Sequence, residues 1–186
     1  SLLPDAIAGK GERDASHFVF RGADGTRYYQ LERFIQAFAD RMSAALYIGY
    51  YMHLVEDSYY RSFYHTIYRF YFNTEEKVRA AHRDYHLLNR YLREKYALSS
   101  SLTIPAAFDA EPIARIAAFD TKGLLRDFAQ DLSETPEGDY SFFTPDIMDE
   151  FMAYALPPCE KELRALLHGD ELLRGADFAW NNNNRS

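Results

Sequence analysis

Residues 44–96 decide the fold, and they read AALYIGYYMHLVEDSYYRSFYHTIYRFYFNTEEKVRAAHRDYHLLNRYLREKY. From 44 to 72 there is no proline and a single glycine, Gly49, which predicts one long helix or two stacked helices. Asn73 and Thr74 then interrupt the pattern, and two glutamates follow Thr74 as in the first turn of a capped helix. Apolar residues recur at spacings of three and four from there on, so we expect a second helix over 75–96.

The rest of the chain also favours helices. The apolar spacing from Tyr28 to Leu46 is helical, and Pro145 is well placed at a first helical position. Strand-like alternation is almost absent, and residues 140–143 are the one plausible extended piece. We therefore expect shorter helices at 111–119, 122–132, 144–156 and 158–168.

The segments between these helices and at the chain ends read as irregular. Residues 1–27 are rich in glycine with little periodicity, the serines at 99–101 read as a linker, and residues 180–184 read as a frayed tail. The sequence thus predicts an all-α class and a single domain over 1–186. Its half at 1–96 would carry a metal site, and 97–186 would hold the C-terminal helices.

Composition excludes several classes of protein. The chain has 186 residues, of which 47% are hydrophobic and 26% charged, so we expect a soluble globular protein without a transmembrane segment. The 21 basic residues against 28 acidic ones give a net charge of -7, which argues against a nucleic-acid partner. A single cysteine, Cys159, excludes a cysteine-rich zinc module, so a metal would need histidine and carboxylate ligands. No leader sequence follows Ser1, which gives the expectation of a cytoplasmic location.

The first candidate site residues are His53 and Asp57, four positions apart in the predicted long helix. At about 100° per residue they project from one face, and an imidazole and a carboxylate presented in this way suit a divalent cation such as zinc. By itself, the same spacing is more often a surface ion pair. Five of the six histidines lie between positions 17 and 86, which favours the metal interpretation.

Three further features extend this pair: Asp5 after Pro4, the run ASHF at 15–18, and the sequence HRDYH at 82–86. In this order they resemble bacterial zinc-dependent phospholipase C, over roughly the stretch from Asp5 to Asn89. The resemblance implies a helical-bundle fold with Asp5, His17, His53 and Asp57 as zinc ligands. The family's later His-x-x-x-Glu would correspond to His82 and His86, with Asp84 as the alternative carboxylate.

The resemblance also implies an activity. It predicts a zinc-dependent hydrolase of phosphate esters, with a phosphodiester or a phospholipid head group as the substrate and Asp5 as metal ligand or general base. The family's N-terminal Trp and nearby His, which bind one of three zinc ions, have no counterpart in this sequence, so we expect one to three ions. His65 is the one candidate for a further family histidine.

Two other interpretations stay open. One is a non-catalytic helical bundle with a relict or structural metal site, in which Asp5 caps a turn and His17 packs beside aromatic rings. The other is a nuclease of the related helical zinc type, which fits the ligands but not the overall charge.

The many tyrosines are expected to line the core, with Tyr50, Tyr60 and Tyr64 able to orient metal-bound carboxylates. A lipid-facing rim, if present, would be formed by the phenylalanines at 142–143 or at 18 and 20.

Overall fold

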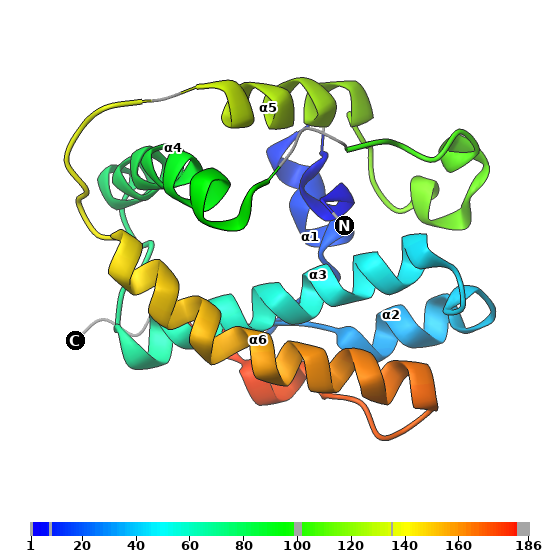
Figure 1. Ribbon diagram of the computed structural model, residues 1–186. Coiled ribbons are helices and arrows are strands. Elements are labelled where there is room, and N and C mark those ends of the chain that lie inside the picture. The colour runs from blue at the N-terminus through cyan, green and yellow to red at the C-terminus, as the bar shows by residue number, and fades with distance from the viewer. Residues whose placement is uncertain (1, 8, 99–101, 135, 182–186) are drawn as a thin grey trace.

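The computed structural model describes residues 2–7, 9–98, 102–134 and 136–181, and it shows a mainly α-helical protein with one small antiparallel sheet (Figure 1). The predicted linker at 99–101 and residues 182–184 of the predicted tail lie outside the described residues. The α-helices are α1 (Arg13–Ser16), α2 (Leu31–Ala37), α3 (Ala45–Ser62), α4 (Glu75–Tyr96), α5 (Thr121–Ser133) and α6 (Pro145–His168). The strands are β1 (Val19–Arg21), β2 (Thr26–Tyr29) and β3 (Trp180–Asn181), in the order β1-β2-β3.

The two central helices form close to where the sequence predicts them. Helix α3 continues into a wider turn, η4 (Phe63–Ile67), and the chain is then non-helical up to Thr74, so the predicted helix ends earlier than residue 72. Helix α4 has the predicted bounds, and the Thr74 hydroxyl accepts a hydrogen bond from the backbone N–H of Lys77 at 3.2 Å. It ends where Ala97 takes a left-handed conformation, with φ of 50°.

The sheet was not predicted. Residues 19–29 form a hairpin in which Val19 lies opposite Tyr29, closed by a turn at Gly25, whose φ of 87° favours glycine. The prediction of an irregular loop up to residue 27, followed at once by helix, is therefore wrong for this segment. Strand β3 adds to the hairpin from the other end of the chain, with Trp180 opposite Arg27. Trp180 is buried with its ring 5.0 Å from that of Tyr29, so the predicted frayed tail is wrong for 180–181.

The C-terminal half also differs from the prediction. Helix α6 runs unbroken through Pro157 and Pro158, although each proline removes one backbone donor, so the predicted pair of helices is a single one. Residues 111–119 are not an α-helix and contain a short 3-10 turn, η6 (Pro112–Arg115), whereas α5 confirms the helix expected at 122–132.

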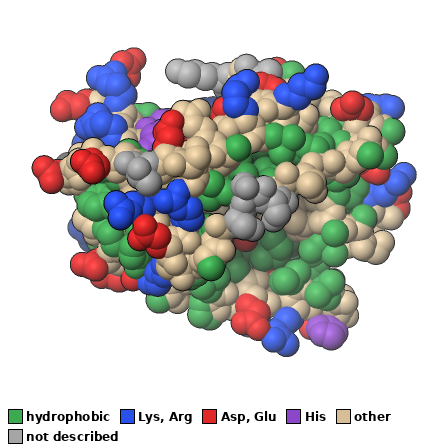
Figure 2. Space-filling view, turned by 45° about the horizontal axis from the view of Figure 1, so that its top comes forward, with side chains coloured by type: hydrophobic (Ala, Val, Ile, Leu, Met, Phe, Trp, Pro, Cys, Tyr) green, Lys and Arg blue, Asp and Glu red, His purple; other side chains and the backbone are tan. Residues whose placement is uncertain are grey.

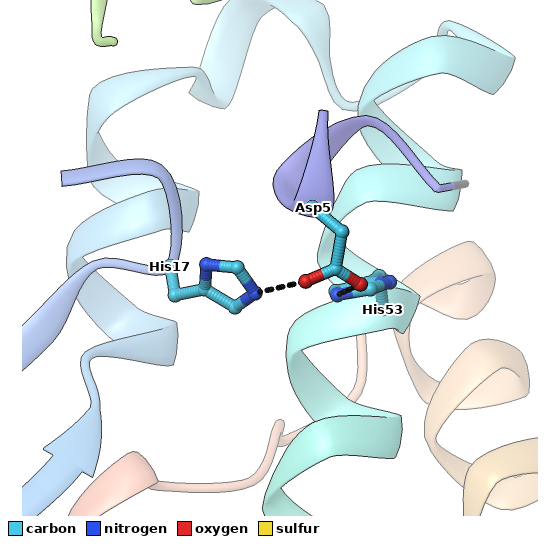
Figure 3. A group of neighbouring side chains, drawn as sticks. All are labelled: Asp5, His17 and His53. Atoms are coloured by element: carbon cyan, nitrogen blue, oxygen red, sulfur yellow. Dashed lines mark ion pairs between the residues drawn. The ribbon is translucent and has the colours of Figure 1, made fainter. Parts of the chain in front are cut away.

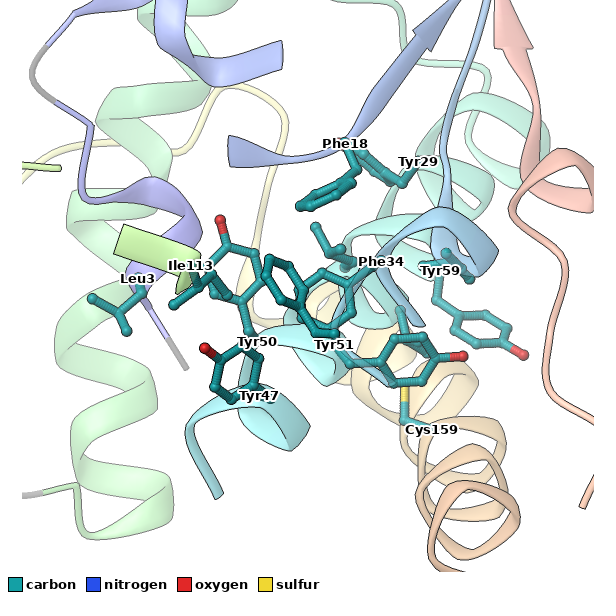
Figure 4. Close-up of a cluster of buried hydrophobic side chains, with 14 of the residues drawn as sticks. Leu3, Phe18, Tyr29, Phe34, Tyr47, Tyr50, Tyr51, Tyr59, Ile113 and Cys159 are labelled. Atoms are coloured by element: carbon teal, nitrogen blue, oxygen red, sulfur yellow. The ribbon is translucent and has the colours of Figure 1, made fainter. Parts of the chain in front are cut away.

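The main core surrounds α3, which contacts α2 on one side and runs alongside α6 on another (Figures 1 and 4). Its largest buried members are aromatic, as expected of the tyrosines, and Tyr51 donates a hydrogen bond to the buried carboxylate of Glu162 on α6. The 3-10 turn η7 (Gly175–Phe178) fits closely against this core. A Cβ atom on Gly175 would lie 1.8 Å from the carbonyl oxygen of Tyr29, so this position requires glycine.

A second cluster of buried side chains joins η4, α4 and the start of α6, with Phe63, Leu88 and Phe143 among its members. Beneath it, the side chain of Asp84 is fully buried and accepts hydrogen bonds from the backbone N–H groups of Ser141, Phe142 and Phe143 at 2.7–2.9 Å. Asp84 therefore ties α4 to the segment that leads into α6. Within the described residues, no helix has both the length and the apolar character needed to cross a bilayer.

Candidate metal centre

Three separate elements bring Asp5, His17 and His53 together (Figure 3). Asp5 ends the 3-10 turn η1 (Leu3–Asp5), His17 directly follows α1, and His53 lies in the middle of α3. The Asp5 carboxylate lies between the two rings, with Oδ1 3.2 Å from His17 Nε2 and Oδ2 3.5 Å from His53 Nε2. Ligand atoms in a tetrahedral zinc site with bonds of about 2.1 Å are roughly 3.4 Å apart, so this spacing suits a divalent cation.

Contacts outside the group hold these residues in place. Tyr50 on α3 donates a hydrogen bond of 2.6 Å to the carbonyl oxygen of Ser16, which fixes the end of α1 against the helix that carries His53. Phe18 has a φ of 52°, a strained conformation for a side chain of this kind, and its ring is buried against Phe34. The position of His17 is thus set by packing on both sides of it.

The surroundings of His17 also fix where its proton lies. Nδ1 is 3.1 Å from the carbonyl oxygen of Arg13, which can only accept, so Nδ1 carries the hydrogen. The Ser16 hydroxyl fits this assignment, because it donates to the same carbonyl at 3.1 Å and accepts from Nδ1 at 2.9 Å. Nε2 of a neutral His17 is then an unprotonated acceptor that faces a carboxylate, which is the arrangement of a histidine metal ligand oriented by a backbone carbonyl.

Among the described residues, the buried Nε2 atoms of His17 and His53 and the Oδ2 atom of Asp57 have no hydrogen-bond partner. Asp57 lies one helical turn after His53, and its Oδ2 is 3.6 Å from His17 Nε2. Buried polar atoms are normally paired, so the unpaired Nε2 atoms of His17 and His53 beside the Asp5 carboxylate need a cation or protons between them. Asp57, the fourth predicted ligand, lies beside His17 but outside the group of mutually close ligand atoms.

Arg13 supplies part of the missing positive charge. Its guanidinium is 3.1 Å from Asp5 and 4.0 Å from Asp57, at the exposed side of the group. Burial tends to raise the pKa of the Asp5 carboxyl. A hydrogen bond from His17, which forms when Nε2 carries a proton, together with the charges of His53 and Arg13 outweighs burial and holds this pKa well below its usual range. Burial also lowers the pKa of His53, more than the nearby carboxylates raise it. At neutral pH the group is therefore a carboxylate and a neutral imidazole in the states that metal ligands require.

The group opens into a cavity of about 510 Å³ between α3 and α4. Asp5, Arg13 and Asp57 line one wall, and the exposed His82 of α4 lines the opposite wall. The hydroxyl groups of Tyr60 and Tyr85, which both line the cavity, are joined by a hydrogen bond, so the Tyr60 hydroxyl contacts a tyrosine and not a carboxylate of the group. His82 faces the same space as the carboxylates but lies outside the three-residue group of mutually close ligand atoms.

Three other candidate residues take different positions. Asp84 is fully buried and satisfied by three backbone N–H groups, so the interpretation of Asp84 as a metal ligand is wrong. His86 is exposed one helical turn beyond His82 and lies 3.3 Å from Asp131 of α5, and it does not line the cavity. His65 is buried beside Tyr71 and lines a separate cavity of about 190 Å³. Helical geometry explains why His82 lines the cavity and Asp84 does not, because the two residues lie about 200° apart around the axis of α4.

The sequence reasoning missed two cationic residues of the cavity, Arg13 and Arg61. A signal for both was present: Arg13 precedes His17 by four residues, and Arg61 follows Asp57 by four residues on the same helix. Over the face shown in Figure 2, acidic and basic side chains are interspersed between hydrophobic patches, so local groupings of this kind are not visible in the net charge.

Comparisons of the chain with models of protein families, with curated proteins and with solved structures found no match. The chemistry of the site therefore has to be argued from its geometry.

Proposed function

We propose that the chain is a zinc-dependent hydrolase of phosphate esters that cleaves phosphodiesters in the manner of phospholipase C. The observation that carries this proposal is the carboxylate of Asp5 between two imidazole nitrogens, one of which has its proton placed by a backbone carbonyl. The residues are those that the resemblance to the zinc-dependent phospholipase C family indicates, in the same order along the chain.

Within the proposal each residue has a distinct role. Asp5, His17 and His53 would hold the ion, which would supply a Lewis acid and lower the pKa of a water molecule towards neutrality. Asp5 contacts both histidines, so it serves as a ligand, and Asp57, with an unpaired Oδ2 beside the cavity, is the carboxylate left to accept a proton. A second ion would have to use Asp57 and His82, since Asp84 and His86 lie elsewhere.

The cavity supports a small anionic substrate. Its volume of about 510 Å³ is within the range of about 300–1,000 Å³ usual for small-molecule sites, and the guanidinium groups of Arg13 and Arg61 line it. Fixed cations beside a reacting phosphoryl group stabilise the charge that develops on its oxygens.

A water-soluble phosphodiester fits better than a lipid surface. Phe18 and Phe143, two of the phenylalanines considered for a lipid-facing rim, are 8% and 2% exposed and belong to the two cores. They are not available for insertion into a bilayer, and Phe20 is 37% exposed but stacked on Tyr28.

The second candidate function is a non-catalytic bundle, and one observation favours it. The Arg13 guanidinium already contacts both carboxylates of the group, so it neutralises part of their charge without a metal ion. In that case the cluster would serve to hold η1, α1 and α3 together.

Hydrolysis of bis-p-nitrophenyl phosphate by the zinc-supplemented chain distinguishes the proposed hydrolase from the non-catalytic bundle. The proposal predicts turnover that His17→Ala abolishes together with zinc binding, whereas Asp57→Asn lowers kcat by at least about a hundredfold while the three-ligand site keeps its zinc. His86→Ala is the matched control and should retain full turnover. Zinc binding without any turnover in the wild-type chain would support the non-catalytic alternative instead.

A further inference from the structure

A second, smaller cavity adjoins the candidate metal centre. It has a volume of about 140 Å³, and four arginines line it: Arg13, Arg21, Arg27 and Arg61. Two of them, Arg13 and Arg61, also line the larger cavity that contains Asp5 and Asp57. The two cavities therefore meet at the same pair of arginines.

The charge around this small cavity is strongly unbalanced. One carboxylate, Asp14, lines it, and Arg21 pairs with that carboxylate with an Nη2 to Oδ1 distance of 2.8 Å. Arg13 is directed to Asp5 and Asp57, while within the described residues Arg27 and Arg61 have no carboxylate within 4.0 Å. Two guanidinium groups without a directly contacting carboxylate among the described residues, in a chain with a net charge of -7, indicate a place for an anion.

Arg61 is held rigidly for such a role. Its guanidinium carbon lies 5.5–5.7 Å from the ring centres of Tyr60, Phe72 and Trp180, and Nε donates to the Tyr29 hydroxyl at 3.4 Å. Burial and the nearby Asp57 raise the pKa of Tyr29 to about 12, so this hydroxyl is neutral and does not form an ion pair with Arg61. The carboxylates of Asp57 and Asp5 act on Arg61 from beyond 4.0 Å. A cation fixed between aromatic faces loses little side-chain entropy when it binds an anion.

The size of the cavity limits what enters it. Whole small-molecule ligands occupy about 300 Å³ or more, so 140 Å³ suits one group of a ligand whose remainder lies in the larger cavity. Arginine forks match the oxygens of a phosphoryl group in particular.

We propose that the cavity bounded by Arg13, Arg21, Arg27 and Arg61 binds a second phosphoryl group of the substrate, one that is not cleaved. The inference rests on the proposed function for the position of the scissile ester, and it narrows the substrate class to phosphodiesters that carry an additional phosphate. The anion site itself needs no metal, because its cations belong to the chain.

Inorganic phosphate is the direct probe, titrated by isothermal calorimetry at low ionic strength into chain freed of metal by a chelator. We expect binding that Arg27→Gln weakens by at least about tenfold, since a charged hydrogen bond is lost. Arg79→Gln, on an exposed face of α4 where Arg79 pairs with Glu75, is the control and should bind as the wild type does. Circular dichroism of each variant checks its fold, and Arg21→Gln provides a second variant at the rim.

Absence of phosphate binding by the wild-type chain, or equal binding by Arg27→Gln, would overturn the anion site. Failure of the proposed function would be seen separately, as a wild-type chain that binds phosphate but does not bind zinc. For the zinc-loaded chain, Arg27→Gln should raise the KM of thymidine 3′-phosphate 5′-(p-nitrophenyl phosphate) at least about tenfold more than that of bis-p-nitrophenyl phosphate, at unchanged kcat. An equal rise for both substrates would contradict the assignment to a second phosphoryl group.

Discussion

Nδ1 of His17 lies 3.1 Å from the carbonyl oxygen of Arg13, and the guanidinium of the same Arg13 lies 3.1 Å from the Asp5 carboxylate that His17 faces with its other nitrogen. One residue thus orients the imidazole through its backbone and balances the carboxylate through its side chain. A cation that binds between His17 and Asp5 would take over the second task, which frees Arg13 for an anionic substrate.

Removal of the hydroxyl that supports this arrangement should weaken zinc binding. Tyr50→Phe deletes the donor to the Ser16 carbonyl, and we expect zinc affinity to fall by about tenfold and the free energy of unfolding by about 1 kcal/mol. Tyr47→Phe is a matched control on the same helix, because its hydroxyl donates to Glu111, away from the site. Zinc titration measures the affinity of both variants, and urea unfolding measures their stability. A Tyr50→Phe chain with the zinc affinity of the wild type would show that Tyr50 has a packing role alone.

Asp84→Asn should act on stability and not on metal binding. The carboxylate accepts three backbone hydrogen bonds in a fully buried position, and an amide would direct a donor at one of those N–H groups. We expect a loss of about 2–3 kcal/mol in urea unfolding, with the zinc affinity of the folded variant unchanged. Asp131→Asn, at an exposed position on α5, should change the free energy of unfolding little. A stable Asp84→Asn chain with weakened zinc binding would restore Asp84 as a ligand.

Acid should destabilise the fold through His65. This side chain is 8% exposed and its two ring nitrogens have no partner among the described residues, and burial together with the charge of Arg61 lowers its pKa to about 4. The unfolded chain, with a pKa of about 6.5, then binds more protons than the folded chain between pH 6.5 and 4. The contribution of His65 is fully present above pH 6.5 and is lost as the pH falls through this window, by up to about 3 kcal/mol.

Unfolding by urea at several pH values measures this effect. His65→Gln, which cannot take up a proton, should show a flatter dependence of the unfolding free energy on pH than the wild type. His168→Gln, at the exposed end of α6, should retain the wild-type slope. An identical slope in His65→Gln and the wild type would mean that His65 is protonated in the folded chain.

Local patterns in the sequence were sufficient for part of the fold. Helix α4 was predicted with its bounds, because its cap at Thr74 and its apolar spacing are both contained in the segment itself. The pairing of Trp180 with Arg27 could not be read in this way, since it depends on a partner about 150 positions away along the chain. Helix α6 was divided in the prediction at Pro157, where packing of the flanking turns against the core overrides the local cost of two prolines.

The candidate site, like the fold, could be predicted only in part from the sequence. The convergence of His17 with His53 was predicted from the resemblance to the zinc-dependent phospholipase C family, and in the structure the centres of the two rings are 5.5 Å apart. The role of Asp84 was missed because the backbone N–H groups that it accepts from belong to residues 141–143, whose approach to α4 leaves no pattern in the sequence. His82 and His86 could not be told apart in the sequence, because they lie four residues apart on one face of α4. In the structure His82 lines the cavity, whereas His86 lies beside Asp131 of α5.

The most direct test of the central claim is a zinc titration by isothermal calorimetry of chelator-treated chain, carried out on the wild type, Asp5→Asn, His17→Gln, His53→Gln and the control His86→Gln. The account predicts at least one zinc ion per wild-type chain, a loss of affinity of at least about a hundredfold in each of the first three variants, and wild-type binding by His86→Gln. A wild-type chain that binds no zinc, or zinc binding that depends on His86 and not on His17, would contradict it.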